Sequence, residues 1–379
     1  MTRHFRRLAA FAAVAATLAV FACFNPCEQP ADEEPPGVQT LHFGTYHVCL
    51  LDDEGKVWCT GVNEAGQLGD GTTKTRDELV LVRGIEDVVG LAVGMFDTNC
   101  AWNDAGKLWC WGSNEYGVLG DEELSMSAEP VEVDGVGSVV DVSLGAFHGC
   151  ALTNAGDVYC WGSNANGQLG IGEVGGIVTE PTRVEKLEQV AEVRAGGAHS
   201  CARTTDGEVY CWGSNETGQI GAEYVDPADV EEPVNISQFF EGEAKALDVA
   251  FHHSCVIAGE ARQLYCWGNN DYGQLGLDDL NPRIAPAEIA EMAYVDDLAV
   301  AGGQVCAQIE ETTYCAGEVM RPVQEVKEAG GGFVFQQSEA LGQAEELWSG
   351  VLAVCGPAAD DTVGCRGVEH QEIGGDELF

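Results

Sequence analysis

The sequence predicts an all-β protein, a seven-bladed β-propeller of about 50-residue repeats with four short antiparallel strands per blade. One pattern recurs with a nearly fixed period, which marks a repeat architecture. Each repeat also contains about four short apolar runs bounded by turn residues, without a long helical period. Four-stranded units repeated radially form a β-propeller. The first cysteine of each copy lies at Cys49, Cys100, Cys150, Cys201, Cys255, Cys306 and Cys355.

A β-hairpin opens each copy of the pattern, best seen at residues 150–170, C-A-L-T-N-A-G-D-V-Y-C-W-G-S-N-A-N-G-Q-L-G. If Cys150 faces Cys160, then Thr153 faces Asp157 and residues 154–156 form a three-residue loop. Gly156 is then at the position that needs a left-handed conformation. The cysteines fall at a non-hydrogen-bonded site, where Cα atoms lie roughly 4.5 Å apart and a disulfide can form.

One disulfide is therefore predicted for each hairpin. The predicted pairs are Cys49–Cys59, Cys100–Cys110, Cys150–Cys160, Cys201–Cys211, Cys255–Cys266, Cys306–Cys315 and Cys355–Cys365. In the fifth and sixth pairs the spacing changes by one residue, so we expect a bulge or a different loop there, with strand pairing retained. The null alternative, a zinc site, is disfavoured because no C-x-x-C motif occurs.

The rest of each repeat contains a bulky anchor, a tight loop rich in Asn and Gly, and a second anchor. The first anchors are Trp111, Trp161, Trp212 and Trp267, and the second are Leu119, Leu169, Ile220 and Leu275. A proline follows, at Pro130, Pro181, Pro233 or Pro286, with a short strand such as residues 131–133. A further strand, Val139–Leu144 in the third copy, leads into the next hairpin.

The combined pattern, G-x-x-H-x-C-A-L…G-x-V-Y-C-W-G-x-N-x-x-G-Q-L-G, resembles the repeat of the regulator of chromosome condensation family over residues 38–379. The resemblance implies a seven-bladed propeller. It weakens in repeat six, where Ala316-Gly317 runs on towards Pro322 without the loop motif, and in repeat seven, where Arg366 replaces the Trp. Some members of the family look like interaction platforms, and one secreted bacterial group inhibits β-lactamases.

The N-terminal segment resembles a bacterial lipoprotein signal peptide over residues 1–22. Arg3, Arg6 and Arg7 precede an apolar run that ends at Ala22, and Cys23 follows. Such a run is short for a membrane span and typical of a signal peptide, with Cys23 as the lipidation site. Ordinary cleavage is the alternative. Residues 23–37 form an acidic, Pro-rich tether. We expect an outer-membrane or surface lipoprotein of a bacterial cell envelope, outside the cytoplasm.

Ring closure requires the two ends of the propeller to meet. We expect the strand near Val38–Phe43 and the C-terminal tail to lie in neighbouring or shared blades, because an open ring would expose strand edges.

Composition supports an oxidising compartment and argues against nucleic acid as a partner. Sixteen cysteines divide into seven hairpin pairs plus Cys23 and Cys27, as expected of an extracytoplasmic protein. The chain has 62 acidic and 18 basic residues, a formal net charge of −44. Such a surface repels phosphate backbones. The family's nucleotide-exchange activity on a small GTPase, combined with chromatin binding, is therefore not carried over to this chain.

Four histidines recur two residues before the first cysteine: His47, His148, His199 and His253. Equivalent positions in a propeller form a ring, so a metal site is conceivable. Neighbouring blades hold such positions well apart, however, and we favour structural hydrogen bonding.

No catalytic motif occurs, and no cofactor is expected. We expect a monomeric, non-catalytic binding platform that presents loops to a protein or glycan partner, an inhibitor of an envelope enzyme being one variant. Candidate contact regions are residues 222–245, residues 330–335, and the turns around Asn114, Asn164, Asn215 and Asn270. The alternatives are a carbohydrate-active hydrolase using acidic residues at the propeller face, and an exchange-type regulator.

Overall fold

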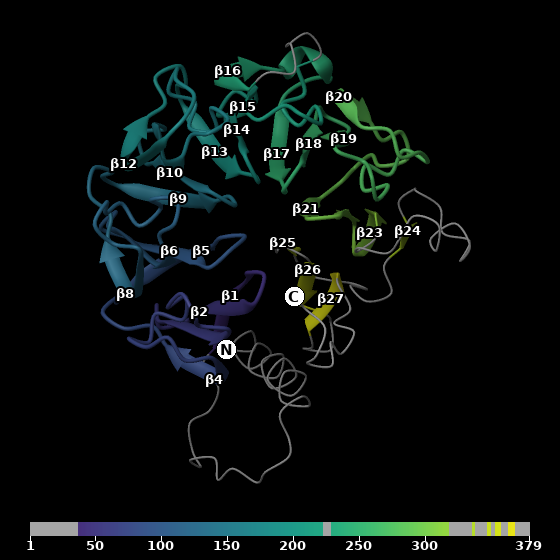
Figure 1. Cartoon of the computed structure of the whole chain (residues 1–379). Helices are drawn as coiled ribbons and strands as arrows, with labels where there is room; N and C mark the ends of the chain where they lie inside the picture. The colour runs from purple at the N-terminus through teal and green to yellow at the C-terminus, as the bar shows by residue number, and fades with distance from the viewer. Residues whose placement is uncertain are drawn as a thin grey trace.

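The computed structural model describes residues 37–222 and 229–317, together with residues 336–337, 347–349, 353–357 and 363–367. Seven sheets surround a central axis (Figure 1). Six have four strands and are the blades; the last has three. All observed strand pairs are antiparallel, and the all-β propeller with short four-stranded blades is confirmed.

Blades one to three follow the chain in order. Blade one contains β1 (Val38–Phe43), β2 (His47–Asp52), β3 (Val57–Gly61) and β4 (Arg76–Leu81). Blade two contains β5 (Val88–Val93), β6 (Thr98–Asn103), β7 (Leu108–Ser113) and β8 (Met126–Glu132). Blade three contains β9 (Val139–Leu144), β10 (His148–Thr153), β11 (Val158–Ser163) and β12 (Ile177–Arg183).

The second half of the ring repeats this plan. Blade four contains β13 (Val190–Ala195), β14 (His199–Thr204), β15 (Val209–Gly213) and β16 (Val230–Asn235), followed by the 3-10 helix η1 (Ser237–Phe239). Blade five contains β17 (Ala244–Val249), β18 (His253–Ala258), β19 (Gln263–Gly268) and β20 (Arg283–Glu288). Blade six contains β21 (Asp297–Ala301), β22 (Gln304–Ile309), β23 (Thr312–Gly317) and β24 (Gln336–Gln337). The three-stranded sheet contains β25 (Trp348–Ser349), β26 (Ala353–Pro357) and β27 (Val363–Gly367).

The strands of each blade are paired in chain order, and the first strand lies nearest the axis (Figure 1). The predicted strand Val139–Leu144 is β9, the innermost strand of the blade whose hairpin follows it. The strand expected at residues 131–133 is longer, spanning Met126–Glu132 and including Pro130. It is an outermost strand, where a missing N–H on the free edge removes no ladder hydrogen bond.

The prediction of seven four-stranded blades is wrong for the seventh, because the structure describes six such blades and a three-stranded sheet. In blades one to five a Trp or Thr, an Asn and a Gly-x-(Leu/Ile)-Gly turn carry the chain from the third strand to the fourth. At the end of β27 and directly after it, the sequence reads Arg366-Gly367-Val368-Glu369 instead. The three-stranded sheet lies between blades six and one, because β25 lies close to both β21 and β1. The first strand therefore neighbours the last sheet, while the C-terminal tail lies outside the described residues.

The hairpin geometry inferred from cysteine spacing is confirmed. Cys150 faces Cys160, and the Thr153 N–H donates to the Asp157 carbonyl at 2.9 Å. Gly156 has φ of 81°, as the three-residue loop requires. Six disulfides are present, each with Cα atoms 4.1 or 4.2 Å apart. Cys355 and Cys365 also face one another across β26 and β27, but their side chains lie outside the described residues.

The two hairpins of different length keep their pairing and change their loops. Between Cys255 and Cys266 the ladder is continuous to Ala258 opposite Gln263, which leaves a four-residue loop. Between Cys306 and Cys315 it continues to Ile309 opposite Thr312, which leaves two residues. Loop length therefore absorbs the single-residue change, and the disulfide position is preserved.

Apolar cores lie between neighbouring blades rather than within one. Trp212 and Ile220 of blade four are fully buried in one cluster with Leu169 of blade three and Trp267 of blade five. The glycine after each Trp allows the second and third strands of the same blade to lie close together. Gly213 has φ of 102°, and a Cβ there would lie 2.7 Å from the Ala198 carbonyl oxygen. Any other residue would push the two strands of the hairpin apart.

Removal of one hairpin disulfide should lower stability without changing the fold. The double variant Cys201→Ala/Cys211→Ala loses the crosslink of a loop with sequence separation 10. The chain-entropy model gives a loss of about 2–3 kcal/mol in the free energy of unfolding. Urea unfolding without reductant measures it, with the disulfide-intact wild type as the reference. Unchanged stability in the variant would show that the crosslink does not constrain the unfolded chain.

Candidate binding face

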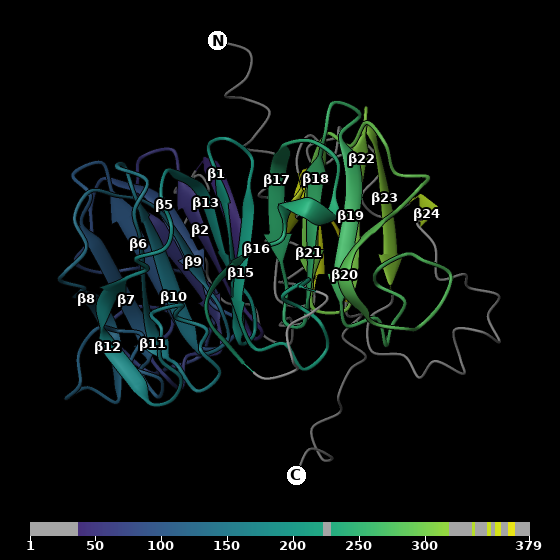
Figure 2. The same ribbon diagram turned by 90° about the horizontal axis from the view of Figure 1, so that it is seen from above.

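The loops of the propeller gather at two opposite faces, because all strands run roughly along the axis (Figure 2). One face carries the loops from the first to the second strand and from the third to the fourth strand of each blade; we call it the loop face. In blade three these are residues 145–147 and 164–176. The other face carries the disulfide hairpin turns and is the hairpin face.

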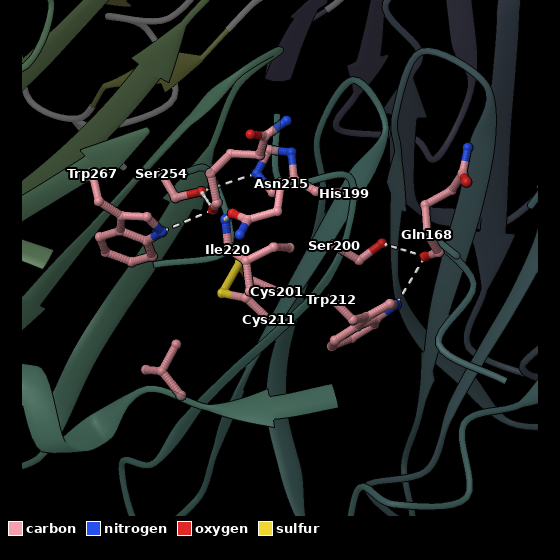
Figure 3. Close-up of a disulfide and its surroundings, with 12 residues drawn as sticks. Gln168, His199, Ser200, Cys201, Cys211, Trp212, Asn215, Ile220, Ser254 and Trp267 are labelled. Atoms are coloured by element: carbon pink, nitrogen blue, oxygen red, sulfur yellow. Dashed lines mark hydrogen bonds between the residues drawn. A yellow bond between two sulfur atoms is a disulfide. The ribbon is translucent and has the colours of Figure 1, made fainter. Parts of the chain in front are cut away.

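Tryptophan side chains tie each of blades two to five to the blade before it. The indole Nε1–H of Trp212 donates to the carbonyl oxygen of Gln168, 2.8 Å away in blade three (Figure 3). The acceptor is always the residue directly before the second anchor of the preceding blade. The other pairs are Trp111 with Gln67 at 3.0 Å, Trp161 with Val118 at 2.7 Å and Trp267 with Gln219 at 2.8 Å. The predicted anchors thus hold blades together and satisfy a buried indole donor.

The recurrent histidines complete this contact. His148 Nε2 lies 2.8 Å from the Ser200 hydroxyl of the next blade, and that hydroxyl donates to the Gln168 carbonyl at 2.9 Å. Since the hydroxyl hydrogen is used, Nε2 must carry the proton and donate. His199 repeats the contact with Ser254 at 2.9 Å, and His47 with the Asn99 side-chain oxygen at 2.8 Å. The structural interpretation of these three histidines is confirmed.

The glycine of the G-x-x-H pattern is required for a steric reason. A Cβ at Gly145 would lie 2.8 Å from Cε1 of His148, so a side chain there would displace the ring. At His253 both partners change: Ala250 stands in the glycine position and Val305 in the serine position. The residue before each first cysteine was the sequence signal for this contact, and it was overlooked. Within the described ranges, no group of three or more metal-ligating side chains was found.

The asparagines of the turns expected to contact a ligand have buried side chains, so they organise these turns and do not themselves reach a ligand. Asn164 Nδ2–H donates to the Glu173 carbonyl at 2.8 Å, and its Oδ1 accepts from Leu169 N–H at 3.2 Å. Asn114, Asn215 and Asn270 hold the following Leu or Ile N–H in the same way. All four side chains are at most 7% exposed. They fix the loop that carries the carbonyl acceptor for the next blade.

The other candidate contact regions have different outcomes. Within residues 222–245, those that the structure describes belong largely to the scaffold: they supply β16, the 3-10 helix η1 and the start of β17, and Ile236 and Phe240 are buried. Residues 223–228 lie outside the described residues. Residues 330–335 lie outside the described residues, as do Cys23 and Cys27. None of the helices that the structure describes combines the length and apolar character needed to cross a membrane.

Charged side chains line a cavity of about 260 Å³ on the axis, formed by the innermost strands. Arg194 in β13 pairs with Asp141 of blade three at 3.1 Å and with Glu192 at 2.8 Å, and lies 3.9 Å from Asp248 of blade five. Burial raises the pKa of Asp248 to about 6, although Arg194 and two backbone N–H groups oppose the rise. Burial would lower the Arg194 pKa, but the three carboxylates outweigh it and raise that pKa above its ordinary value.

Both oxygens of Asp248 are occupied by backbone donors. Oδ1 accepts from Val249 N–H at 2.9 Å and Oδ2 from Val300 N–H of blade six at 2.7 Å. The carboxylate therefore joins the innermost strands of blades five and six. Together with Arg194 it braces three adjacent blades around the axis.

Aromatic side chains gather on the loop face. The Phe147 ring of blade three lies 4.8 Å from Tyr116, 5.8 Å from Phe96 and 6.5 Å from Phe251 (ring centroids). Phe251 also contacts the ring of His252, which is exposed. Phe96 is 43% exposed. These five residues form a continuous group, which we call the aromatic patch.

Blade four has no large side chain in its loop between the first and second strands, so the aromatic patch continues across it. Its loop is Gly196-Gly197-Ala198, and a Cβ at Gly197 would lie 2.8 Å from the Phe251 ring. Phe147 of blade three and Phe251 of blade five can therefore meet above it. Sequence reasoning missed the patch because its members occupy the variable positions of the repeat. The signal was there: aromatic residues recur between the glycine and the histidine of G-x-x-H.

Buried neutral histidines should make the protein acid-sensitive. Burial lowers the pKa of His148 and of His199 to about 3, against about 6.5 unfolded. Between these values the unfolded chain binds the additional protons, so stability is complete above about pH 6.5 and falls as the pH drops towards 3. Each histidine contributes up to about 1.4 kcal/mol per pH unit.

Urea unfolding between pH 7 and pH 4 measures this effect. His148→Gln should be less stable than the wild type at pH 7 but should show a shallower loss on acidification. His252→Gln, on the exposed edge of the aromatic patch, is the control and should alter the slope much less. Parallel pH profiles for His148→Gln and wild type would contradict a neutral, buried His148.

The observations together define a class: a repeat-built, disulfide-stapled β-propeller whose motif residues join neighbouring blades and whose variable loops meet on one face. A family model described as an RCC1-like domain matches residues 19–319. The chain belongs to the RCC1-like domain family.

Relatives in sequence include human E3 ubiquitin-protein ligase HERC2, 31% identical over 260 residues, and the Arabidopsis thaliana ultraviolet-B receptor UVR8, 27% identical over 269 residues. The matches cover 66% and 68% of this chain, but only 5% of HERC2 and 59% of UVR8. This chain therefore matches only part of the length of each of these relatives.

Solved structures share the fold. Human WBSCR16 has a TM-score of 0.73 at 22% identity, with 88% of each chain covered. Prp20p of Saccharomyces cerevisiae has a TM-score of 0.69 at 19% identity, covering 88% of this chain and 83% of that one. At these identities the likeness shows the propeller fold alone.

Proposed function

We propose that this protein is a non-catalytic binding platform whose loop face docks a protein partner through the aromatic patch. The observation that carries the proposal is the patch itself, which draws on blades two, three and five and includes the exposed Phe96. Aromatic side chains are enriched at the centres of protein interfaces, where they supply most of the binding energy. The hairpin face has no comparable group of contacting aromatic rings within the described residues.

The scaffold supports such a role by rigidity. Disulfides, indole hydrogen bonds and the His–Ser contacts fix each loop on two sides, so little conformational entropy remains to be lost on binding. Fold relatives act in the same general way: the yeast Prp20p structure is described with its binding to Gsp1p and histones, and a further structure shows yeast RCC1 bound to Kap60. An exchange-type activity would rest on this analogy alone, and the acidic surface here opposes binding to nucleic acid.

A carbohydrate hydrolase is the alternative with one observation in its favour. Asp141 and Asp248 line the same axial cavity, and the Asp248 pKa is raised to about 6. Both carboxylates are engaged by Arg194, however, and Asp248 already binds two backbone N–H groups. A general acid would have to give up one of these contacts to hold its proton. Bracing of the blades explains this cluster better than hydrolysis does.

Partner capture from native envelope extracts tests the proposal. The full chain should retain one protein specifically, and Phe96→Ala/Phe251→Ala should weaken that complex at least tenfold, since interface anchors contribute about 2 kcal/mol or more. Tyr294→Ala is the matched control, because Tyr294 is an exposed aromatic on the hairpin face. Capture of glycan fragments that shorten with time, or equal weakening by the control, would refute the platform.

We also propose that the protein is anchored by a lipid on Cys23, outside the cytoplasm. The basic and apolar N-terminal segment and six hairpin disulfides support this placement. Cys23→Ser should move the protein from the membrane fraction to the soluble fraction and remove acyl mass from its N-terminus. Cys27→Ser should leave both unchanged. Membrane retention of Cys23→Ser would exclude this anchor.

A further inference from the structure

A pocket of about 290 Å³ opens on the loop face between blades two and three. Three rings of the aromatic patch line it, and two carboxylates accompany them. The residues that matter to its chemistry are Phe96, Asp97, Glu115, Tyr116 and Phe147. No lysine or arginine is among the residues that line it.

The rings surround the pocket at different tilts. Phe147 lies between the other two, at 64° to Tyr116 and 37° to Phe96. Rings set at such angles present both faces and edges to the space between them. An aromatic face carries partial negative charge, so it attracts a cation held within about 6 Å.

The carboxylates add full negative charge at the same place. Asp97 is held in position because its Oδ1 accepts from Gln67 Nε2–H at 2.7 Å. Glu115 is exposed beside Tyr116 on the loop from the third to the fourth strand of blade two. A purely apolar occupant would remove water from these carboxylates without replacing its hydrogen bonds, which is costly. A cation satisfies both the rings and the carboxylates.

Among the third-to-fourth-strand loops of blades one to five, which the structure describes in whole or in large part, the combination occurs once. The position of Tyr116 is taken by Ala65, Asn166, Thr217 and Tyr272 in blades one, three, four and five. The position of Phe147 in the following blade is taken by Asp97, Ala198, His252 and Gly303. Only the contact between blades two and three has an aromatic residue at both positions. Tyr272 has Gly303 at the position that corresponds to Phe147, so it serves as a control for the Tyr116–Phe147 pair.

We propose that this pocket binds an arginine side chain presented by the protein partner. The proposal rests on the protein-docking function of the loop face and specifies its anchor. A guanidinium is planar, so it stacks on a ring while its N–H groups reach a carboxylate, which a compact ammonium group cannot do equally well. The strongly acidic chain, with a net charge of −44, also favours the approach of a basic partner.

A peptide titration tests the pocket without the partner. The probe is Ac-Gly-Arg-Gly-NH2, and its control is the same peptide with citrulline, which keeps the shape and lacks the charge. The full chain is labelled with ring-¹³C phenylalanine and tyrosine and followed by NMR. We expect shifts at Phe96, Tyr116 and Phe147 with the arginine peptide at millimolar concentrations, and no saturable shift with the citrulline peptide.

Variants locate the site. Tyr116→Ala and Glu115→Gln should each weaken arginine binding about three- to tenfold, the range that a partly exposed cation–π or ionic contact supplies. Tyr272→Ala and Glu64→Gln, at the equivalent loop positions of blades five and one, should leave binding unchanged. Glu115→Gln leaves the ring contacts intact, so it tests the charge even if Tyr116→Ala does not fold.

Several results would overturn the assignment: equal binding of the citrulline peptide, equal loss in Tyr272→Ala, or tighter binding of a lysine or tetramethylammonium probe. The absence of any arginine-dependent shift would also overturn it. Partner capture that still depends on Phe96 and Phe251 would then leave the platform standing without this anchor. If neither the arginine-dependent shift nor capture that depends on Phe96 and Phe251 is observed, the binding-platform proposal is wrong as well.

Discussion

In each of blades one to four, one backbone carbonyl oxygen accepts the tryptophan indole of the next blade, and the arrangement of these blades depends on that contact. In blade three this oxygen belongs to Gln168, which accepts the Trp212 indole and the Ser200 hydroxyl from blade four (Figure 3). Each blade is a small sheet that could hold its own strands with a disulfide. Only contacts of this kind, with the apolar cores beside them, set the angle between one blade and the next. Asn164 matters because it holds the loop that presents this carbonyl.

Because the motif residues are used in contacts within and between blades, few of them are available to bind a partner. The Trp, His and Asn side chains that make the repeat recognisable are buried, and most of them are hydrogen-bonded within the scaffold, so they present nothing to a partner. Recognition must lie at positions where the motif tolerates change. On the loop face these are the residues between the glycine and the histidine, and those between the asparagine and the next glycine. Phe147 and Tyr116 occupy such positions and contact one another.

Structural features that depend on local spacing could be predicted from the sequence. Pairing of Cys150 with Cys160 follows from a constant sum along one hairpin, and Gly156 confirms the loop. The role of Asn164 did not follow, because turn propensity does not say whether the side chain faces solvent or the loop it organises. The aromatic patch depends on Phe147 and Phe251 meeting over Gly197, two blades apart, which no local pattern reveals.

The surface field is one-sided because the chain has 62 acidic and only 18 basic residues. Some of the basic residues are also used within the scaffold: Arg194 is held in the axial cavity by carboxylates from blades three and four and braces the innermost strands, and Arg203 pairs with Glu192 beside it. The loop face therefore presents aromatic rings within a negative field, on a scaffold that is already ordered. Such a surface selects against nucleic acid and acidic proteins by repulsion, and it favours a partner that brings its own positive charge to the rings.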